Sequence, residues 1–439
     1  MSIKKRRWLV IAHCINMDGQ AASHHVSDKL PCLSDRGITP ILLSAASGKK
    51  DEVYKHHQVF SLFPSGLKFE MRHFLRRKLS NKWICEFSIG VFTLFIFPFY
   101  ALEKLFLRFD SQWSWCFTGY LVGKSIIQNS SIQTIYVHGG ASSAFLVAHW
   151  LSRKFEIPWI AECYDPLIHS SWNRTRSAYN WNSWVEKIIC KHAKLAVWYT
   201  DGALQQAKER FPELGDRGIV VRPGMPEPCL NGITYTRGPK IRFCYFGGLT
   251  AERSLSTFLR PLVKVLQKNP EIAEKIEVHA YGGNVDLETL RFLDRHKSLK
   301  SIFNCHGRLE HDQGSGKSGR QRVNEEMRKA DFLILLHGTG EICDLYIPSK
   351  AYEYLWARRP IIVTTPCPQE WKKFMDESIH FIADQNTPQI LEDCITVAIR
   401  KWEQLSSINP NNQKTFSSED AVENILSVLS QNQTLHEHS

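Results

Sequence analysis

The alternation of short apolar runs with longer amphipathic segments constrains the fold more than any other feature of this sequence. Turns that carry glycine or polar residues separate the two kinds of segment. Strands that alternate with helices in this way predict βαβ units, and therefore a parallel sheet with helices packed on its faces. The strands expected in the first half lie at residues 8–12, 37–43, 134–137, 158–162, 195–200 and 219–221.

The alternation is interrupted once and then resumes. Residues 223–239 contain four Pro and three Gly with little periodicity, so we expect a linker at 226–239. Further strands are expected at residues 241–246, 276–281, 299–305, 332–336 and 361–364. The sequence therefore predicts an α/β protein with two doubly wound domains, at 1–225 and 240–410, and a last helix at 416–430 that packs back towards the first domain. In such proteins ligands bind at the carboxyl ends of the strands, in a cleft between the facing domains.

Composition excludes several classes of protein. The chain has 439 residues, of which 43% are hydrophobic, and this excludes a disordered or fibrous protein. The twelve cysteines are scattered without a CxxC pair, so we expect reduced thiols in the cytoplasm rather than disulfides or a zinc site. The N-terminus is similar to a signal peptide, but its apolar stretch at residues 8–12 is short and no cleavage motif follows. We expect this stretch to be a buried strand.

One region, at about residues 66–108, departs from the alternation. Residues 68–82 carry six Lys or Arg against one Glu, a net charge of +5, with Phe and Leu between them. Residues 87–102 then form a stretch of sixteen residues without a charge, which is shorter than the ~20 residues that a spanning helix needs. A basic segment followed by an apolar segment favours docking on an anionic membrane surface. We therefore expect a peripheral protein on the inner face of the plasma membrane; a buried helical hairpin and a spanning segment are the alternatives.

The segment most informative about chemistry is residues 346–365. Pro348 and Ser349 are expected to open a short helix, whose first N–H groups and positive dipole end suit an anion such as a phosphate. Lys350 adds a positive charge at the same place, and Glu353, one turn later, can accept hydrogen bonds from hydroxyls such as those of a ribose. A capped core helix with a surface lysine is the alternative explanation.

This segment closely resembles the P-S-K-x-x-E-Y-L-x-x-x-x-P-I-I element in the donor half of GT-B glycosyltransferases, particularly the retaining enzymes of glycosyltransferase family 4. Residues 245–254 resemble the strand and loop that open the second domain in that family. In this loop Gly248 replaces the usual arginine, and Arg253 stands where a lysine is expected. Residues 306–309, which include Arg308, resemble the segment beside the nucleotide base.

The resemblance extends to the first half of the chain, except for about residues 45–120. Gly19 follows the first expected strand, as the family's glycine-containing loop does, and residues 162–166 resemble its end-of-strand His/Asp-Pro element. Asp165 is then the best candidate to orient the acceptor or to shield positive charge on the sugar, and His138 ends another strand. A turn-capping aspartate and a structural histidine are the alternatives for these two catalytic candidates.

The resemblance implies a GT-B fold with two Rossmann-like domains, the first for the acceptor and the second for the donor. It implies hexosyl transfer with retention from a nucleotide-diphosphate sugar. Because the apolar, basic insertion lies in the acceptor domain, we expect a lipid-linked acceptor, or else a polysaccharide, in cell-surface glycan biosynthesis. Positive charge would stabilise the leaving diphosphate; no Asp-x-Asp motif occurs, so we expect no metal, and no cofactor. The implied donor-binding residues are Gly19, Gly248, Arg253, Arg308, Ser349, Lys350 and Glu353. Leu345 departs from the pattern, because many members carry a glutamate there.

Other functions remain as alternatives. A sugar-nucleotide epimerase can use the same fold. The net charge of +11 suggests two further alternatives, a nucleic-acid-binding protein and a non-catalytic membrane-binding protein. No nucleic-acid-binding motif is present, so we expect no nucleic-acid partner. Residues 140–144 form a G-x-S-x-A run like that of a serine hydrolase, with Ala144 where a nucleophile elbow has glycine. Residues 314–318 imitate a phosphate-binding loop, but no strand directly precedes them.

Overall fold

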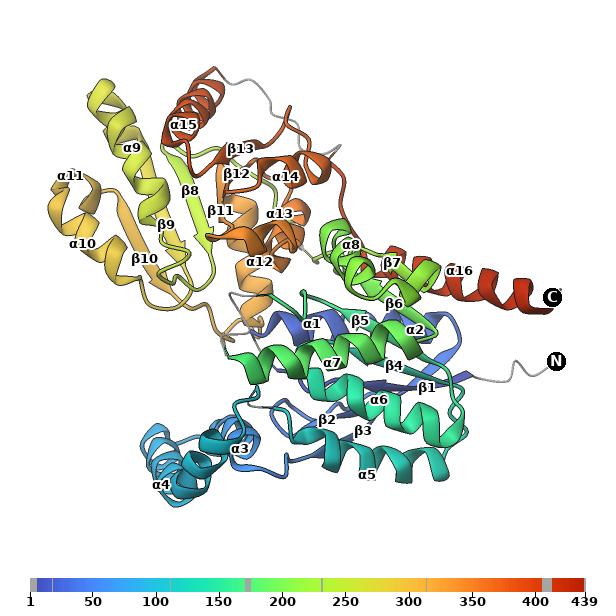
Figure 1. Cartoon of the computed structure of the whole chain (residues 1–439). Helices are drawn as coiled ribbons and strands as arrows, with labels where there is room; N and C mark the ends of the chain where they lie inside the picture. The colour runs from blue at the N-terminus through green and yellow to red at the C-terminus, as the bar shows by residue number, and fades with distance from the viewer. Residues whose placement is uncertain are drawn as a thin grey trace. The chain divides into compact units, whose positions relative to one another are not determined.

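The chain folds into two compact units, which are described separately. The computed structural model describes residues 6–17, 19–110, 112–169, 175–229, 232–312, 314–404 and 413–437. Unit 1 comprises Met1–Pro226 together with Ser417–Ser439, and unit 2 comprises Glu227–Phe416 (Figure 1). Each unit contains one parallel sheet with interleaved helices, so the predicted α/β class is confirmed.

Unit 1 is built on a seven-stranded parallel sheet with the order β3-β2-β1-β4-β5-β6-β7. Its strands are β1 (Arg6–Ile11), β2 (Ile38–Ala45), β3 (Lys55–Val59), β4 (Thr134–His138), β5 (Trp159–Cys163), β6 (Leu195–Trp198) and β7 (Gly218–Val220). The strand order reverses between β1 and β4, which pair with each other in register from Trp8↔Thr134 to Ile11↔Val137. Loops on either side of such a reversal leave in opposite directions, which opens the carboxyl edge of the sheet there.

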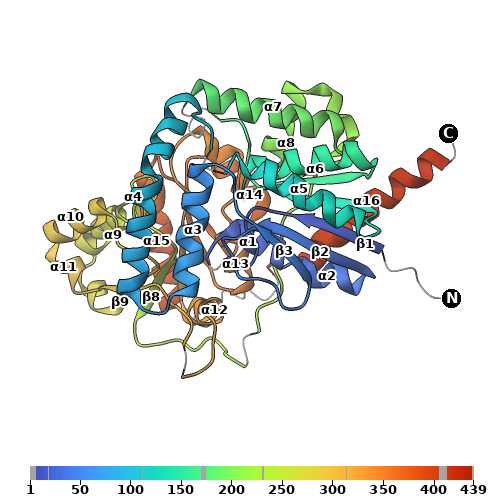
Figure 2. The ribbon, with the colours of Figure 1, turned by 90° about the horizontal axis from the view of Figure 1, so that it is seen from below.

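Helices cover both faces of the unit 1 sheet. The helices of this unit are α1 (Ala21–Ser27), α2 (Leu30–Asp35), α3 (Pro64–Lys78), α4 (Lys82–Phe106), α5 (Trp115–Gln128), α6 (Ser142–Phe155), α7 (Arg176–His192), α8 (Asp201–Arg210), the 3-10 helix η1 (Pro212–Arg217) and α16 (Ser418–Glu437). Figure 2 shows α5 and α6 on one face and α2 and α16 on the other. Helix α16 completes the core of this unit, because Val422 and Ile425 pack in one buried cluster with Trp8 and Tyr136.

Unit 2 has a six-stranded parallel sheet with the order β10-β9-β8-β11-β12-β13. Its strands are β8 (Ile241–Phe246), β9 (Ile276–Tyr281), β10 (Phe303–Gly307), β11 (Phe332–Leu336), β12 (Ile361–Thr365) and β13 (Phe381–Asp384). Its helices are α9 (Ser256–Lys268), η2 (Pro270–Lys275), α10 (Leu287–Arg295), α11 (Lys297–Lys300), α12 (Gly319–Lys329), η3 (Glu341–Asp344), α13 (Ser349–Trp356), α14 (Pro368–Phe374) and α15 (Pro388–Glu403). Apolar side chains of β8, β9 and β11 pack with α9 and α15 to form its core.

The region that interrupts the alternation is a hairpin of two antiparallel helices, α3 and α4 (Figure 2). Helix α4 has 25 residues with Pro98 inside, so it is longer than the uncharged stretch seen in the sequence. In the described part of the chain it is the one helix whose length and composition would allow it to cross a membrane. Only 11% of its most apolar window is buried. The alternative of a buried hairpin is therefore wrong, because α4 exposes most of its apolar surface.

Two buried carboxylates fix the base of this hairpin to unit 1. Glu70 of α3 accepts hydrogen bonds from the backbone N–H of Ser61 at 2.6 Å and lies 3.1 Å from Nε2 of His13. Glu103 of α4 accepts from the N–H of Ser65 at 2.8 Å and from Nε1 of Trp113 at 2.8 Å. Buried carboxylates are costly unless they are paired. These contacts therefore hold both helices in a defined position at their base.

The pairing of His13 with Glu70 makes a prediction for the pH dependence of stability. Burial opposes the charged imidazolium, but hydrogen bonds to Cys14 and Glu70 outweigh it and raise the pKa of His13 to about 9. Because this pKa is above the ordinary value of 6.5, the contacts of His13 with Cys14 and Glu70 stabilise the fold fully below about pH 6.5, and this contribution is lost as the pH rises through 9. The free energy of unfolding should fall by up to about 3 kcal/mol over this window, at about 1.4 kcal/mol per pKa unit.

Denaturant unfolding at several pH values checks this prediction. Glu70→Gln should flatten the alkaline decline, whereas Glu86→Gln, which removes only an exposed partner of Arg76, should leave it unchanged. An alkaline decline of equal steepness in wild type and Glu70→Gln would show that the pair is not the cause.

Candidate functional site

Three glycines shape the carboxyl edge of the unit 2 sheet. The N–H of Gly247, after β8, donates to the carbonyl of Tyr281 at 2.8 Å, and the N–H of Gly282, after β9, donates to the carbonyl of Gly307 at 2.8 Å. A Cβ at Gly282 would lie 2.0 Å from the carbonyl oxygen of Gly247, so no side chain fits there. Gly248, which follows Gly247, is exposed, and no atom lies within 4 Å of the position that a Cβ would take there. The backbone of these loops is thus directly accessible to a ligand.

Arg253 lies in the loop between β8 and α9. A turn holds this loop, in which the N–H of Arg253 donates to the carbonyl of Thr250 at 3.0 Å, and the buried Ser254 hydroxyl donates to Asp286 at 2.8 Å. The Arg253 side chain is exposed, and its guanidinium makes no hydrogen bond or ion pair with any residue that the structure describes. A Cβ at Gly338 would lie 3.6 Å from Cγ of Arg253, so this side chain runs beside the loop that follows β11.

A buried histidine holds that second loop. His337 accepts a hydrogen bond at Nδ1 from Nε1–H of Trp371 at 3.0 Å, so its proton is on Nε2, which donates to the carbonyl of Tyr346 at 3.0 Å. The Tyr346 hydroxyl donates back to the carbonyl of His337 at 3.1 Å. Burial, together with the charge of Arg253, lowers the pKa of His337 to about 3, so the ring is neutral. This neutral ring ties both ends of the loop that leads into α13.

Helix α13 begins at Ser349, as the sequence predicts, after Pro348. The Tyr354 hydroxyl accepts from the N–H of Phe246 at 2.9 Å and donates to the carbonyl of Ile334 at 3.1 Å, which anchors the helix to β8 and β11. Lys350 Nζ lies 2.5 Å from Oε2 of Glu353, and both side chains are partly exposed. The helix therefore presents a half-exposed lysine beside its first turn, at the same sheet edge as Arg253.

The structure gathers most of the predicted donor residues at one edge. Gly248 and Arg253 follow β8, and Ser349, Lys350 and Glu353 belong to the helix that is anchored to the end of β8. Arg308 is exposed and directly follows β10, the outermost strand, two strands away from β8. His337 was not among the predicted residues; its position directly after a buried strand was the available signal.

The remaining candidates belong to unit 1. Gly19 is exposed in the loop between β1 and α1 with φ +73°, while Asp18 lies outside the described residues. Asp165 follows β5 and is exposed, and its carboxylate makes no hydrogen bond or ion pair with any residue in the described part of the chain. His138 is buried at the end of β4, with Nδ1 3.5 Å from Glu162 Oε2. Burial lowers the pKa of His138 to about 4. The ring is therefore neutral near pH 7.

Glu162 is the centre of a buried network that the sequence did not reveal. Its carboxylate lies 2.5 Å from Nζ of Lys29 and accepts hydrogen bonds from the hydroxyls of Tyr136 and Tyr199. Burial alone would raise the pKa of Glu162, but Lys29 and His138 hold it at about 2. The Glu162 carboxylate is thus ionised inside unit 1. It fixes the end of β5, from which Asp165 projects, against α2.

Two alternatives from the sequence lose their support in this structure. The Ser142 hydroxyl donates to the Asp110 carboxylate at 2.5 Å and accepts from Nε1–H of Trp181 at 2.8 Å, and neither of these partners is a histidine that could activate it. Ser318, in the loop that imitates a phosphate-binding motif, caps helix α12 in a capping box with Gln321. Among the described residues, no group of three or more His, Cys, Asp or Glu could hold a metal ion.

Comparisons with known proteins give the fold. No protein-family model matches this sequence, and no curated protein matches it. Alr3699/HepE from Anabaena, crystallised with UDP, is 12% identical with a TM-score of 0.59, covering 97% of this chain and 100% of that one. The lipopolysaccharide outer core galactosyltransferase WaaB is also 12% identical, with a TM-score of 0.56 and 97% and 99% covered.

A third solved structure comes from another reaction class. UDP-GlcNAc 2-epimerase from Methanocaldococcus jannaschii is 11% identical, with a TM-score of 0.53, covering 97% of this chain and 99% of that one. At these identities the likeness establishes the fold and not the reaction. The chain has the GT-B fold with two Rossmann-like units, as the resemblance implied, and the similar structures include several glycosyltransferases.

Proposed function

We propose that this GT-B chain is a glycosyltransferase that moves a hexose-type sugar from a nucleotide-diphosphate donor to a lipid-linked acceptor, with retention, in cell-surface glycan biosynthesis. The observation that supports it most is the position of Arg253 and Lys350 at one edge of the unit 2 sheet. Arg253 has no carboxylate partner among the described residues, and Lys350 stands in the first turn of α13. Two cations and a helix N-terminus at the ends of parallel strands suit a diphosphate.

The chemistry of transfer explains what these residues do. Cleavage of the bond between the sugar and the diphosphate puts negative charge on the leaving group and positive charge on the sugar. Arg253 and Lys350 offset the first of these through charges that are already in place before the reaction. We propose that this makes the transfer independent of a metal and of any cofactor. Asp165, which is exposed after β5, is our candidate to orient the acceptor.

The donor and the epimerase alternative can be tested together. HepE binds UDP and UDP-glucose in its crystal structures, which makes uridine nucleotides the first donors to try. Labelled UDP-sugars would be incubated with the purified protein, with and without a lipid extract. The proposal expects label in the lipid phase only when the extract is present. Conversion of the donor sugar without any acceptor would favour an epimerase instead, the class represented by the Methanocaldococcus structure.

The hairpin is the reason to propose a membrane acceptor. Helix α4 exposes large apolar side chains over its whole length: Trp83, Ile84, Phe87, Val91, Leu94, Phe95, Phe97, Phe99, Leu102, Leu105 and Phe106. Apolar surface of this extent on a soluble protein marks an interaction site. The neighbouring helix α3 supplies basic side chains, which suit anionic lipids. We therefore place the protein on the cytoplasmic face of the membrane.

The hairpin geometry favours a helix that lies in the membrane surface over one that spans it. Helix α3 runs antiparallel beside α4, with Ser65 bonded to Glu103 at one end and Arg76 bonded to Glu86 at the other. A spanning α4 would carry the charged side chains of α3 into the hydrocarbon. Each charge at the bilayer centre costs roughly 2.5–3.5 kcal/mol on insertion scales. An in-plane position leaves these charges at the headgroups.

Charged substitutions on α4 should reduce membrane binding. The double change Leu94→Glu and Phe95→Glu places two carboxylates on side chains that are 77% and 75% exposed, so folding should be little affected. We expect cosedimentation with phosphatidylserine-containing vesicles to weaken by roughly tenfold or more, because two apolar contacts are lost. Val53→Glu, at an 82% exposed site outside the hairpin, is the matched control and should bind as wild type does. Equal binding of the double variant would contradict docking through α4.

A further inference from the structure

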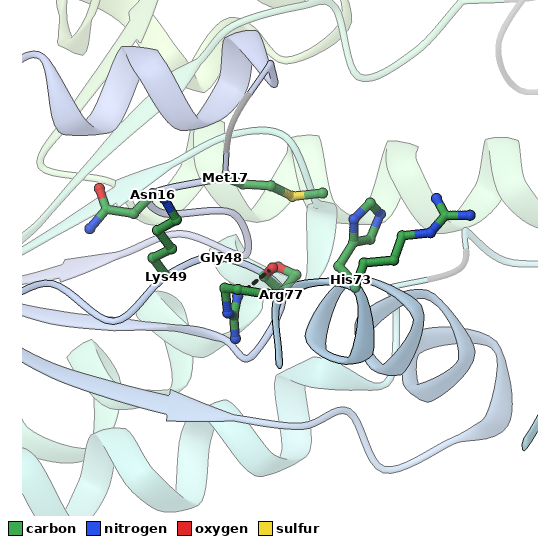
Figure 3. A pocket seen from close by; sticks show the side chains of 8 residues that line it. Asn16, Met17, Gly48, Lys49, His73 and Arg77 are labelled. Atoms are coloured by element: carbon green, nitrogen blue, oxygen red, sulfur yellow. Dashed lines mark hydrogen bonds between the residues drawn. The ribbon is translucent and has the colours of Figure 1, made fainter. Parts of the chain in front are cut away.

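A cavity of about 380 Å³ lies in unit 1, where the second half of α3 faces the loops that follow β1 and β2 (Figure 3). The two loops form its floor and meet backbone to backbone. A Cβ at Gly48 would lie 1.8 Å from the carbonyl oxygen of Ile15, so only glycine allows this contact. Asn16 has φ +53°, and its side chain donates to Asp51 at 2.7 Å. Its carbonyl accepts from the N–H of Lys49 at 2.9 Å. The floor is therefore built and rigid.

The lining of this cavity is strongly cationic. Lys49, Arg76 and Arg77 contribute to it, and no Asp or Glu does. Arg77 donates to the carbonyls of Ser47 at 2.8 Å and Ala46 at 3.3 Å, which orient its guanidinium across the cavity but do not neutralise its charge. Arg76 pairs with Glu86 at 3.0 Å, where both side chains are half exposed. An anion would therefore find at least one oriented guanidinium that no carboxylate in the described chain occupies.

The charges of the lining suit a phosphoryl group. Ser47 is 4% exposed and its Oγ is buried, so this residue contributes the backbone carbonyl that orients Arg77 rather than its hydroxyl. Phosphoryl oxygens accept charge-assisted hydrogen bonds from guanidinium groups. His73, also in the lining, has its pKa lowered to about 4 by burial and neighbouring arginines, so it adds no charge near pH 7.

We propose that this cavity binds the phosphoryl group of a membrane lipid, and that this lipid headgroup belongs to the acceptor. Its volume lies within the range of small-ligand sites, roughly 300–1,000 Å³. The helix that supplies Arg76 and Arg77 packs against the apolar helix α4, so a phosphoryl group held here would keep its lipid tails beside that exposed surface. The acceptor role rests on the proposed function, whereas phosphoryl-lipid binding does not.

Vesicle binding tests the proposal with the full-length protein. Phosphatidylcholine vesicles containing either phosphatidic acid, with its exposed phosphoryl group, or phosphatidylserine would be matched in surface potential. Wild type should bind the phosphatidic acid vesicles roughly tenfold more tightly, the worth of one charge-assisted hydrogen bond. Lys49→Gln, which removes one charge from the lining, should reduce this preference while keeping the binding to phosphatidylserine. Arg72→Gln removes one charge from α3 outside the cavity lining and should keep the preference.

Other outcomes would overturn the proposal. Equal binding of wild type to the two kinds of vesicle would show that the hairpin senses only surface charge. If Arg72→Gln lost the preference for phosphatidic acid as much as Lys49→Gln does, the conclusion would be the same. Binding of inorganic diphosphate in solution, without any preference for phosphatidic acid vesicles, would assign the cavity to a soluble phosphate. Binding of nucleoside diphosphates would be measured separately in wild type and Lys350→Ala, and the proposed function expects its loss in the variant. Failure of the proposed function is therefore distinguishable from failure of the cavity proposal.

Discussion

Replacing Lys350 or Arg253 by alanine is expected to lower kcat/KM for the nucleotide-sugar donor by roughly 10²–10³-fold each, the usual cost of removing one preorganised group that stabilises transition-state charge. The physical reason is that each side chain brings a positive charge to the edge where the diphosphate is proposed to leave. Arg253 is exposed and held by its turn, and Lys350 is held near the helix start by Glu353. Neither substitution removes a core contact, so folding should not change.

Steady-state transfer assays at several donor concentrations measure this effect, with melting curves to verify folding. Lys275→Ala is the matched control, because Lys275 also forms an ion pair, with Glu403 at 3.2 Å, but directly precedes β9 at the opposite edge of the sheet. It should have wild-type kinetics. Wild-type rates in both Lys350→Ala and Arg253→Ala would exclude the proposed diphosphate site.

Replacing Lys29 by methionine should destabilise unit 1 by about 3–5 kcal/mol, the cost of leaving a buried charge without its partner. Glu162 and Lys29 are 0% and 2% exposed, so water cannot take the place of the lost ammonium group. The double variant Lys29→Met and Glu162→Gln removes both charges and should recover part of the loss, since the uncompensated carboxylate is gone. Denaturant unfolding midpoints measure both changes.

The control for this prediction is an exposed ion pair in the same unit. Glu423→Gln breaks a contact with Arg36 at 3.4 Å in which the glutamate is 71% exposed. Exposed pairs contribute only about 0–1 kcal/mol, so this variant should unfold close to wild type. A loss of similar size in Lys29→Met and Glu423→Gln would contradict a special role for the buried pair.

The sequence predicted the central strands and two of the four edge strands, β7 and β10, but it missed the other two edge strands, β3 and β13. Strand β11 is a continuous apolar run, and β8 is apolar except for Arg242, because both faces of the sheet are buried under helices. Strand β3 is mostly polar and lies at the edge of its sheet, so it lacks that signal. Strand β13 is also an edge strand and has only four residues. Edge strands are paired on one side only, and their sequences are correspondingly less constrained.

Contacts between distant residues explain what else the sequence could not show. Lys29 and Glu162 are 133 positions apart, and only the strand order brings the end of β5 against α2. The basic cavity likewise depends on the position of α3 beside the loops that follow β1 and β2. By contrast, Pro348 and Ser349 predicted the start of α13 because a helix start is determined by neighbouring residues. Features that depend on neighbouring residues could be predicted from the sequence, whereas contacts between distant residues could not.

Binding of a nucleotide-diphosphate sugar at the carboxyl edge of unit 2 can be measured by ligand-dependent thermal stability. Purified protein would be melted with each nucleoside diphosphate and its sugars, with and without EDTA. A ligand at about 100 times its dissociation constant adds roughly 2.7 kcal/mol, which a melting curve resolves easily. We expect stabilisation by one nucleoside diphosphate that survives EDTA and is lost in Lys350→Ala. Absence of stabilisation by every nucleotide in the panel, or an equal shift in Lys350→Ala, would contradict it.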